Sequence, residues 1–165
     1  SAGLVAVLAD EDTNPFLMNG EIVKNLTQLY DKYKDSIVNY HSVRDCLTKE
    51  ERKKENPDLT KIDWNKISSE EDADVCLFRT ASSYKNPEAM KKWFELENFT
   101  GVKIVKDEES TDVWANWPSK ERGVRFSSNF LMRIWLNIIV NNTSFSTRYD
   151  QNLKLISARV SNLIL

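Results

Sequence analysis

Histidine, the residue type most often used for proton transfer near neutral pH, occurs only once in the sequence, as His41. A Ser–His–Asp triad would have to include it, and the GxSxG motif of a nucleophile elbow does not occur. The two Gly-rich phosphate-binding motifs, GxGxxG and GxxxxGKS/T, do not occur either. We therefore interpret His41 as an ordinary residue of a helical stretch, and the motifs support neither a triad hydrolase nor a nucleotide-binding enzyme.

Two runs of carboxylates, at residues 70–72 and 107–109, could bind a cation or act as a general acid and base. Their spacing matches no EF-hand loop, and such runs are typical of solvated loops. An enzyme of this kind would need two or more carboxylates in one cleft with raised pKa values. The candidates for that role are Glu70, Asp72, Asp112 and Glu121. We instead predict a protein with no catalytic residue, no cofactor and no metal site.

The two cysteines, Cys46 and Cys76, are 30 residues apart, and neither belongs to a CxxC pair. A structural zinc site needs about four nitrogen or sulfur ligands, which this sequence does not offer in a recognisable spacing. Two interpretations remain open. The cysteines form one disulfide in an oxidising compartment, or they are two buried free thiols that act as small hydrophobic residues.

The most unusual segment is DVWANWPSKERGVRF, at residues 112–126, where Trp114 and Trp117 are followed by Arg122. Trp and Arg are the residue types that most often anchor interfaces and ligand pockets. We therefore name Trp114, Trp117 and Arg122 as candidate contacts for a partner or a ligand. The alternative is that both indoles complete the core beneath a loop.

The composition is that of an ordinary globular protein, with 165 residues, 41% hydrophobic and 29% charged. This length suits one domain with a sizeable core, which we place at residues 13–165. The net charge is −2 and the pI is about 5.6. A general nucleic-acid-binding function is disfavoured, because neutralising phosphates requires a basic surplus.

The first residues, SAGLVAVLA, are small and apolar, and the charged stretch DEDTNP follows abruptly. Nine residues cannot cross a bilayer, which takes about 20 in a helix. We interpret residues 1–12 as the remnant of a membrane anchor or of a signal segment. The alternative is a first strand or a helical turn that packs on the core.

A long helix is predicted from Glu21 to about Leu47, because apolar residues recur there at steps of three and four. Its apolar face is rich in tyrosine, which suits a groove that contacts water or a partner. We name Tyr30 and Tyr33 as candidate partner contacts on this helix. The alternative is that the stripe is simply part of the core.

Several shorter elements are expected after this helix. The apolar run 74–80 is predicted as a buried strand, and the uninterrupted alternation of 130–140 predicts the longest strand. Asn86 and Pro87 form a helix start, in which Asn caps and Pro takes the first position. The remaining expected elements are short strands at 101–105 and 123–126 and a closing helix that starts near residue 147 and runs to Leu163.

This order predicts an α+β fold, in which a central antiparallel sheet is flanked by a long N-terminal helix and a C-terminal helix. PAS and GAF sensory modules have this arrangement, although unrelated domains share it. In such modules, the elements before the last strands line the ligand cavity or the partner face.

Residues 67–79, ISSEEDADVCLFR, resemble a stretch of the periplasmic domain of T-even phage holins. In that domain a helix with interspersed tyrosines leaves the membrane, an ISSE turn leads into a strand, and paired strands and a helix close the fold. The matching elements here would be the helix 25–40, the turn 67–70, the strand 74–79, the strand 130–140 and the final helix 149–163. Cys46 and Cys76 do not match the late cysteines of that family, so the resemblance carries over no disulfide.

The resemblance implies a membrane-tethered regulator of lysis timing without catalytic residues. We accordingly expect a non-enzymatic domain at the periplasmic face of the inner membrane, anchored through a segment upstream of Ser1. Its partner would be an antiholin-type regulatory protein, and it could form homo-oligomers. The alternative is a small-molecule sensor of PAS or GAF type in which Trp114, Trp117 or Trp135 lines a closed cavity.

Overall fold

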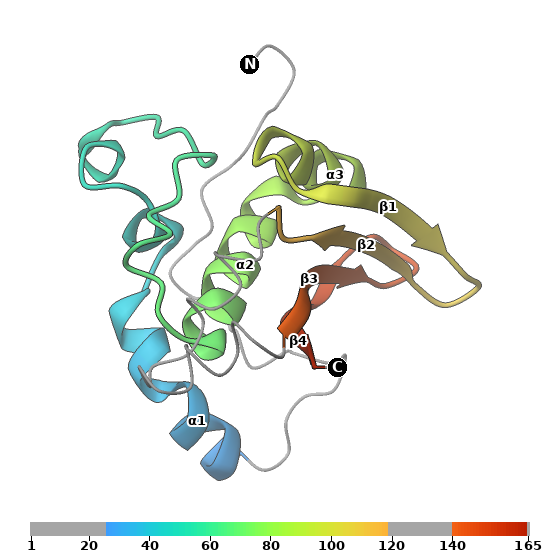
Figure 1. The fold of residues 1–165 in the computed structure, drawn as a ribbon, viewed down its shortest axis with the longest axis horizontal. Coiled ribbons are helices and arrows are strands. Elements are labelled where there is room, and N and C mark those ends of the chain that lie inside the picture. Colours follow the sequence, from blue (N-terminus) through green and yellow to red (C-terminus); the bar gives the residue numbers. More distant parts are fainter. Residues whose placement is uncertain (1–25, 119–139, 165) are drawn as a thin grey trace.

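The computed structural model describes residues 26–118 and 140–164 and combines three α-helices with four β-strands (Figure 1). The predicted N-terminal remnant (1–12), the strand 123–126 and most of the strand 130–140 lie outside these residues. The elements are α1 (Leu26–Asn39), the 3₁₀ helices η1 (Val43–Cys46) and η2 (Glu51–Lys53), α2 (Glu70–Tyr84), α3 (Pro87–Leu96), β1 (Thr100–Lys106), β2 (Thr111–Asn116), β3 (Val140–Tyr149) and β4 (Leu155–Ile164).

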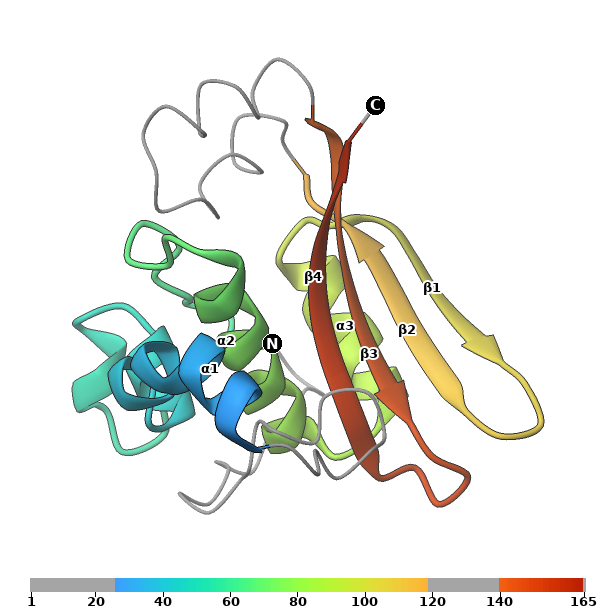
Figure 2. The same ribbon diagram turned by 90° about the horizontal axis from the view of Figure 1, so that it is seen from below.

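The four strands form one antiparallel sheet in the order β1-β2-β3-β4, so each strand pairs with its neighbour in the sequence. Helices α2 and α3 cover one face of this sheet, and α1 packs on the far side of α2 (Figure 2). The described chain therefore has three layers, with α2 in the middle. The predicted α+β class with an antiparallel sheet is confirmed, and its flanking helices differ from the prediction.

Helix α2 replaces the buried strand that we predicted at residues 74–80, so that prediction is wrong. The physical reason is the position of α2 between two layers. Burial extends all around the helix, and even the side chains of Asp74 and Arg79 are buried. A helix buried on every side has no polar stripe, so its sequence looks like the continuous apolar run of a buried strand.

Helix α1 ends at Asn39, eight residues before the end of the predicted long helix. At Ser42 the backbone is extended, and the Asp45 carboxylate accepts a hydrogen bond from the Ser42 N–H, so a separate 3₁₀ turn begins there. The apolar pattern continues past the helix end because Val43 and Leu47 are buried in the same core. The prediction was therefore wrong about the length of the helix.

The predicted closing helix is also absent, because β3 continues to Tyr149 and β4 begins at Leu155. The Asp150 carboxylate accepts hydrogen bonds from the backbone N–H groups of Asn152 and Lys154 and so holds the turn between the two strands. Leu153 has a positive φ of 60° in this turn. Two elements that the holin resemblance implies, the strand 74–79 and the helix 149–163, are thus not present.

Two local predictions are confirmed. Helix α3 begins at Pro87, and the Asn86 side chain accepts a hydrogen bond from the Ala89 N–H at 2.8 Å. The short strand predicted at 101–105 lies within β1. The acidic run 107–109 forms an exposed turn, in which the Asp107 carboxylate accepts hydrogen bonds from the next backbone N–H groups.

Of the two interpretations of the cysteines, the disulfide is confirmed. Cys46 at the end of η1 is bonded to Cys76 in α2, and both residues are buried. The bond closes a loop across a separation of 30 residues. It therefore ties the irregular segment between α1 and α2 to the central helix.

Candidate functional site on the open face of the sheet

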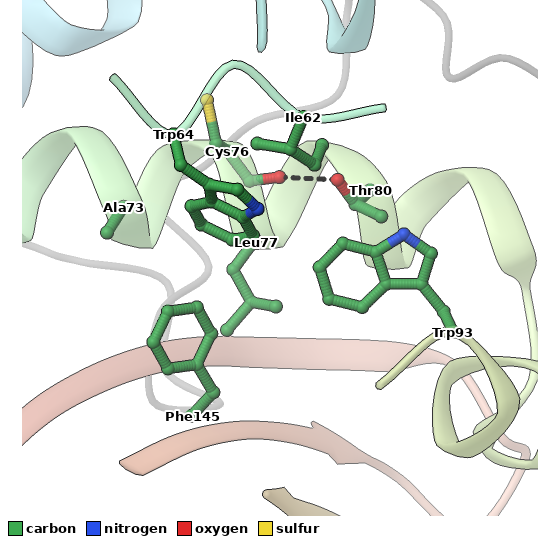
Figure 3. Close-up of a pocket in the computed structure, with 8 residues that line it drawn as sticks. All are labelled: Ile62, Trp64, Ala73, Cys76, Leu77, Thr80, Trp93 and Phe145. Carbon is green, nitrogen blue, oxygen red and sulfur yellow. Dashed lines mark hydrogen bonds between the residues drawn. The ribbon is translucent and has the colours of Figure 1, made fainter. Parts of the chain in front are cut away.

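A small-molecule sensor would need an internal pocket, and one small cavity lies among the described side chains of α2, α3 and β3 (Figure 3). Its volume is about 10 Å³, enough for about one water molecule, and its walls are almost entirely apolar. Neither Trp114 nor Trp117 belongs to its lining. The lining residues are Ile62, Trp64, Ala73, Cys76, Leu77, Thr80, Trp93 and Phe145.

Trp117 is part of an aromatic cluster that fills this interior. Its ring stacks on Phe145 at a centroid distance of 5.3 Å and meets Trp64 edge-on at 4.6 Å. Trp117 is buried, as is Trp93, whose indole N–H donates to the Leu59 carbonyl at 2.9 Å. For Trp117 the alternative assignment to the core is therefore confirmed.

Tyr33 is buried as well, and its hydroxyl donates a hydrogen bond to Asp74 Oδ2 at 2.8 Å. Burial, together with the neighbouring Asp74 carboxylate, raises the pKa of Tyr33. Tyr33 thus joins α1 to α2 and is not presented to a partner. The side chain of Tyr30 and the residues Arg122 and Trp135 lie outside what the structure describes.

Of the carboxylates proposed for an enzyme, Asp72 and Asp112 lie on different elements and have different partners. Asp72, in the first turn of α2, accepts a hydrogen bond from the Ser36 hydroxyl, whereas Asp112 lies on β2 and pairs with Arg148. Glu121 falls outside the described residues. No group of three or more His, Cys, Asp and Glu side chains that could hold a metal ion occurs within residues 26–118 and 140–164.

Sequence reasoning did not identify one buried acid, Asp74. Its Oδ2 accepts from Tyr33, and its Oδ1 accepts from the backbone N–H of Val160 at 2.7 Å. Burial raises the pKa of Asp74 to about 7, and the two hydrogen bonds act in the opposite direction. Since Val160 lies on β4, an edge strand of the described sheet, we interpret Asp74 as a link that joins both helices to this edge.

Trp114 is the one predicted contact residue that the structure shows to be exposed. Burial alternates along β2, with Val113 and Ala115 directed toward the helices and Trp114 directed away from them. The exposed fraction of Trp114 is 37%. No described helix or strand covers this outer face of the sheet, which we call the open face (Figure 2).

The strand register extends the open face across the whole sheet. Trp114 pairs with Lys103 on β1 and with Ser146 on β3, and Ser146 pairs with Arg159 on β4. These four residues, which we call the central row, lie on adjacent strands spaced about 4.8 Å apart. The sheet therefore presents one indole with a cation on each side of it, at unequal distances.

The residues beside the central row are mostly small or neutral. Arg148 on β3 forms a two-pronged ion pair with Asp112 on β2, with its Nε 2.8 Å from Oδ1 and its Nη2 3.0 Å from Oδ2. The opposite charges of this pair cancel, and the hydrogen bond to the Asp112 carboxylate raises the pKa of Arg148 above its ordinary value. Lys103 and Arg159 form no ion pair within the part of the chain that the structure describes. The outward positions of the four strands thus hold three cations and one carboxylate, and the Asp107 carboxylate in the turn after β1 also acts on Arg148.

Comparisons with protein-family models, with curated proteins and with solved structures found no match. The holin resemblance and the PAS or GAF arrangement therefore stay predictions. Among the described helices, none is long and apolar enough to cross a membrane.

Proposed function

We propose that this chain is a non-enzymatic recognition module of an oxidising compartment outside the cytoplasm. It binds an anionic target on the open face of its sheet. The observation that carries the proposal is the central row, in which Lys103 and Arg159 lie on either side of Trp114. Exposed Trp and Arg side chains are typical anchors of binding surfaces, and uncompensated cations favour a target of opposite charge.

The disulfide between Cys46 and Cys76 supports the proposed compartment. Disulfides persist in the periplasm and outside cells, whereas cytosolic thiols are kept reduced. This agrees with the expected periplasmic location at the inner membrane. A lysis regulator that binds an antiholin-type protein would be one such module, and its partner would need an acidic surface.

The alternative, a small-molecule sensor, would require a larger pocket than the one cavity described here. Ligand pockets for small molecules are clefts of roughly 300–1,000 Å³. The cavity beside Trp64 and Phe145 holds about 10 Å³ and is lined by apolar side chains. This cavity is therefore too small for such a ligand, and we place the binding surface on the open face.

Amide NMR tests this proposal. Poly-L-glutamate and an oligogalacturonate serve as anionic probes at low salt, and poly-L-lysine is the control of opposite charge. We expect at least one polyanion to shift the amides of residues around Lys103, Trp114 and Arg159, and the shifts to weaken with added salt because exposed charges are screened. Shifts centred on another surface, or equal shifts with poly-L-lysine, would contradict the proposal.

A further inference from the structure

We propose, on the basis of the function proposed above, that the anionic target is a linear glycan that carries carboxylates. Its sugar rings stack on Trp114, and its carboxylates pair with Lys103 and Arg159. Three properties of the open face favour a glycan over an acidic protein surface: its size, the chemistry around the indole and the spacing of the two cations.

The open face is small for a stable protein complex. Four strands at about 4.8 Å spacing and about three outward residues on each give an area on the order of 400 Å². A standard protein interface buries about 800 Å² on each partner. A chain-like ligand that lies across the strands can use this area fully, whereas a globular partner would need contacts beyond it.

The surroundings of Trp114 suit a sugar ring. Its neighbour in the central row, Ser146, is small, and so are Ser144 and Ser161 in the row on one side. In the row on the other side, Arg148 is held in its ion pair with Asp112. A pyranose offers a C–H face that packs on an indole and hydroxyl groups that bond to serine hydroxyls. An acidic peptide would bring charge without a ring to stack.

The spacing in the central row predicts that an oligomer binds better than a single sugar. Lys103 is one strand away from Trp114, about 4.8 Å, whereas Arg159 is two strands away on the other side, roughly 10 Å. A sugar stacked on Trp114 can place its carboxylate near Lys103, but only a neighbouring sugar reaches Arg159. The planar guanidinium of Arg159 suits a two-pronged contact with a carboxylate.

Isothermal titration calorimetry on the full chain, with three probes, distinguishes the contribution of the sugar rings to the affinity from that of the carboxylates. Oligogalacturonate has both, its methyl ester has the rings without the charge, and poly-L-glutamate has the charge without the rings. We expect oligogalacturonate to bind at least about tenfold more tightly than either of the others. Affinity should rise with chain length from the monomer and fall with added salt.

Variants locate the site. Trp114→Ala should lower the affinity about tenfold or more, as expected for a central aromatic anchor, and Trp114→Tyr should restore part of it. Lys103→Gln should lower the affinity about two- to fivefold, the range of an exposed ion pair. The matched control is Lys53→Gln, which removes an exposed lysine of η2 away from the sheet and should leave binding unchanged. Thermal melting confirms that each variant is folded.

The outcomes separate the two proposals. If poly-L-glutamate binds as tightly as oligogalacturonate and depends on Lys103 and Trp114, the glycan inference is overturned and the anion-binding function stands. If the methyl ester binds as tightly as the acid, the role of the carboxylates is overturned. If no probe binds, or if the Trp114→Ala variant binds the probes with unchanged affinity, both proposals fail.

Discussion

The Asp74 carboxylate accepts a hydrogen bond from the backbone N–H of Val160 at 2.7 Å, although 86 positions separate the two residues. Val160 pairs with Phe145 across β3 and β4, and β4 is an edge strand of the described sheet. Unpaired N–H groups of an edge strand invite pairing with other chains. Asp74 satisfies one such group from the middle layer, and Tyr33 connects the same carboxylate to α1.

Replacing Asp74 tests this link. Asp74→Ala leaves the Val160 N–H and the Tyr33 hydroxyl buried without their acceptor, and each unsatisfied group costs about 1–3 kcal/mol. We expect this variant to lose at least about 2 kcal/mol in the free energy of unfolding measured by urea denaturation. Asp74→Asn keeps an acceptor oxygen for Val160 and should lose much less. Equal losses in the two variants would show that the hydrogen bonds do not matter.

Stability should also depend on pH through Asp74. Burial raises its pKa from the ordinary 3.8 to about 7, so between these values the folded protein keeps a proton that the unfolded chain has released. The contribution of Asp74 to the free energy of unfolding is therefore most favourable below pH 4. It declines as the pH rises to 7, by on the order of 4 kcal/mol in total, and is constant above that. The measurement is the stability of wild type minus that of Asp74→Asn from pH 4 to 8. A difference that stays flat would contradict the raised pKa.

The disulfide should account for a sizeable part of the stability. For a loop of about 30 residues, chain entropy predicts a contribution of about 3–4 kcal/mol from the Cys46–Cys76 bond. The Cys46→Ala/Cys76→Ala double variant should lose this amount in urea denaturation, and reduced wild type should lose about the same. Because both cysteines are buried, a reductant should act on the native protein only after it unfolds. Rapid reduction of the folded protein would contradict this picture.

Predictions from local capping signals succeeded, whereas predictions from hydrophobic periodicity failed where an element is buried on all sides. Helix α3 was predictable because its signals, Asn86 as the cap and Pro87 in the first turn, are adjacent in the chain and act locally. Helix α2 was mistaken for a strand because burial between two layers removed its periodicity. A local signal was present there too, since the Ser69 side chain accepts from the N–H of Asp72, as in the S/T-x-x-D/E capping pattern.

In the candidate site, too, the sequence identified one residue locally but not the residues that long-range pairing brings beside it. Trp114 stood out by residue type, but its neighbours Lys103, Ser146 and Arg159 have nothing unusual around them in the sequence. They meet Trp114 only through the register of four strands, which links positions 56 residues apart. The alternation of β4 was hidden for a related reason, because its apolar residues also fit a helical spacing by chance. Register arises from long-range pairing, so a single sequence does not reveal it.

Gly101 provides a test of that register at β1, the other edge strand of the described sheet. It has a φ of +58° at the bulge between Thr100 and Lys103, and a Cβ placed there would lie 2.7 Å from Nδ2 of Asn116 on β2. Gly101→Ala should therefore lose about 1–3 kcal/mol in urea denaturation, from the left-handed backbone and the close contact together. Gly101→Ala combined with Asn116→Ala removes the close contact and should lose less than the two single changes added together. Strict additivity, or no loss in Gly101→Ala, would mean that the bulge is not built as described, and the alignment of Lys103 with Trp114 would then lose its support.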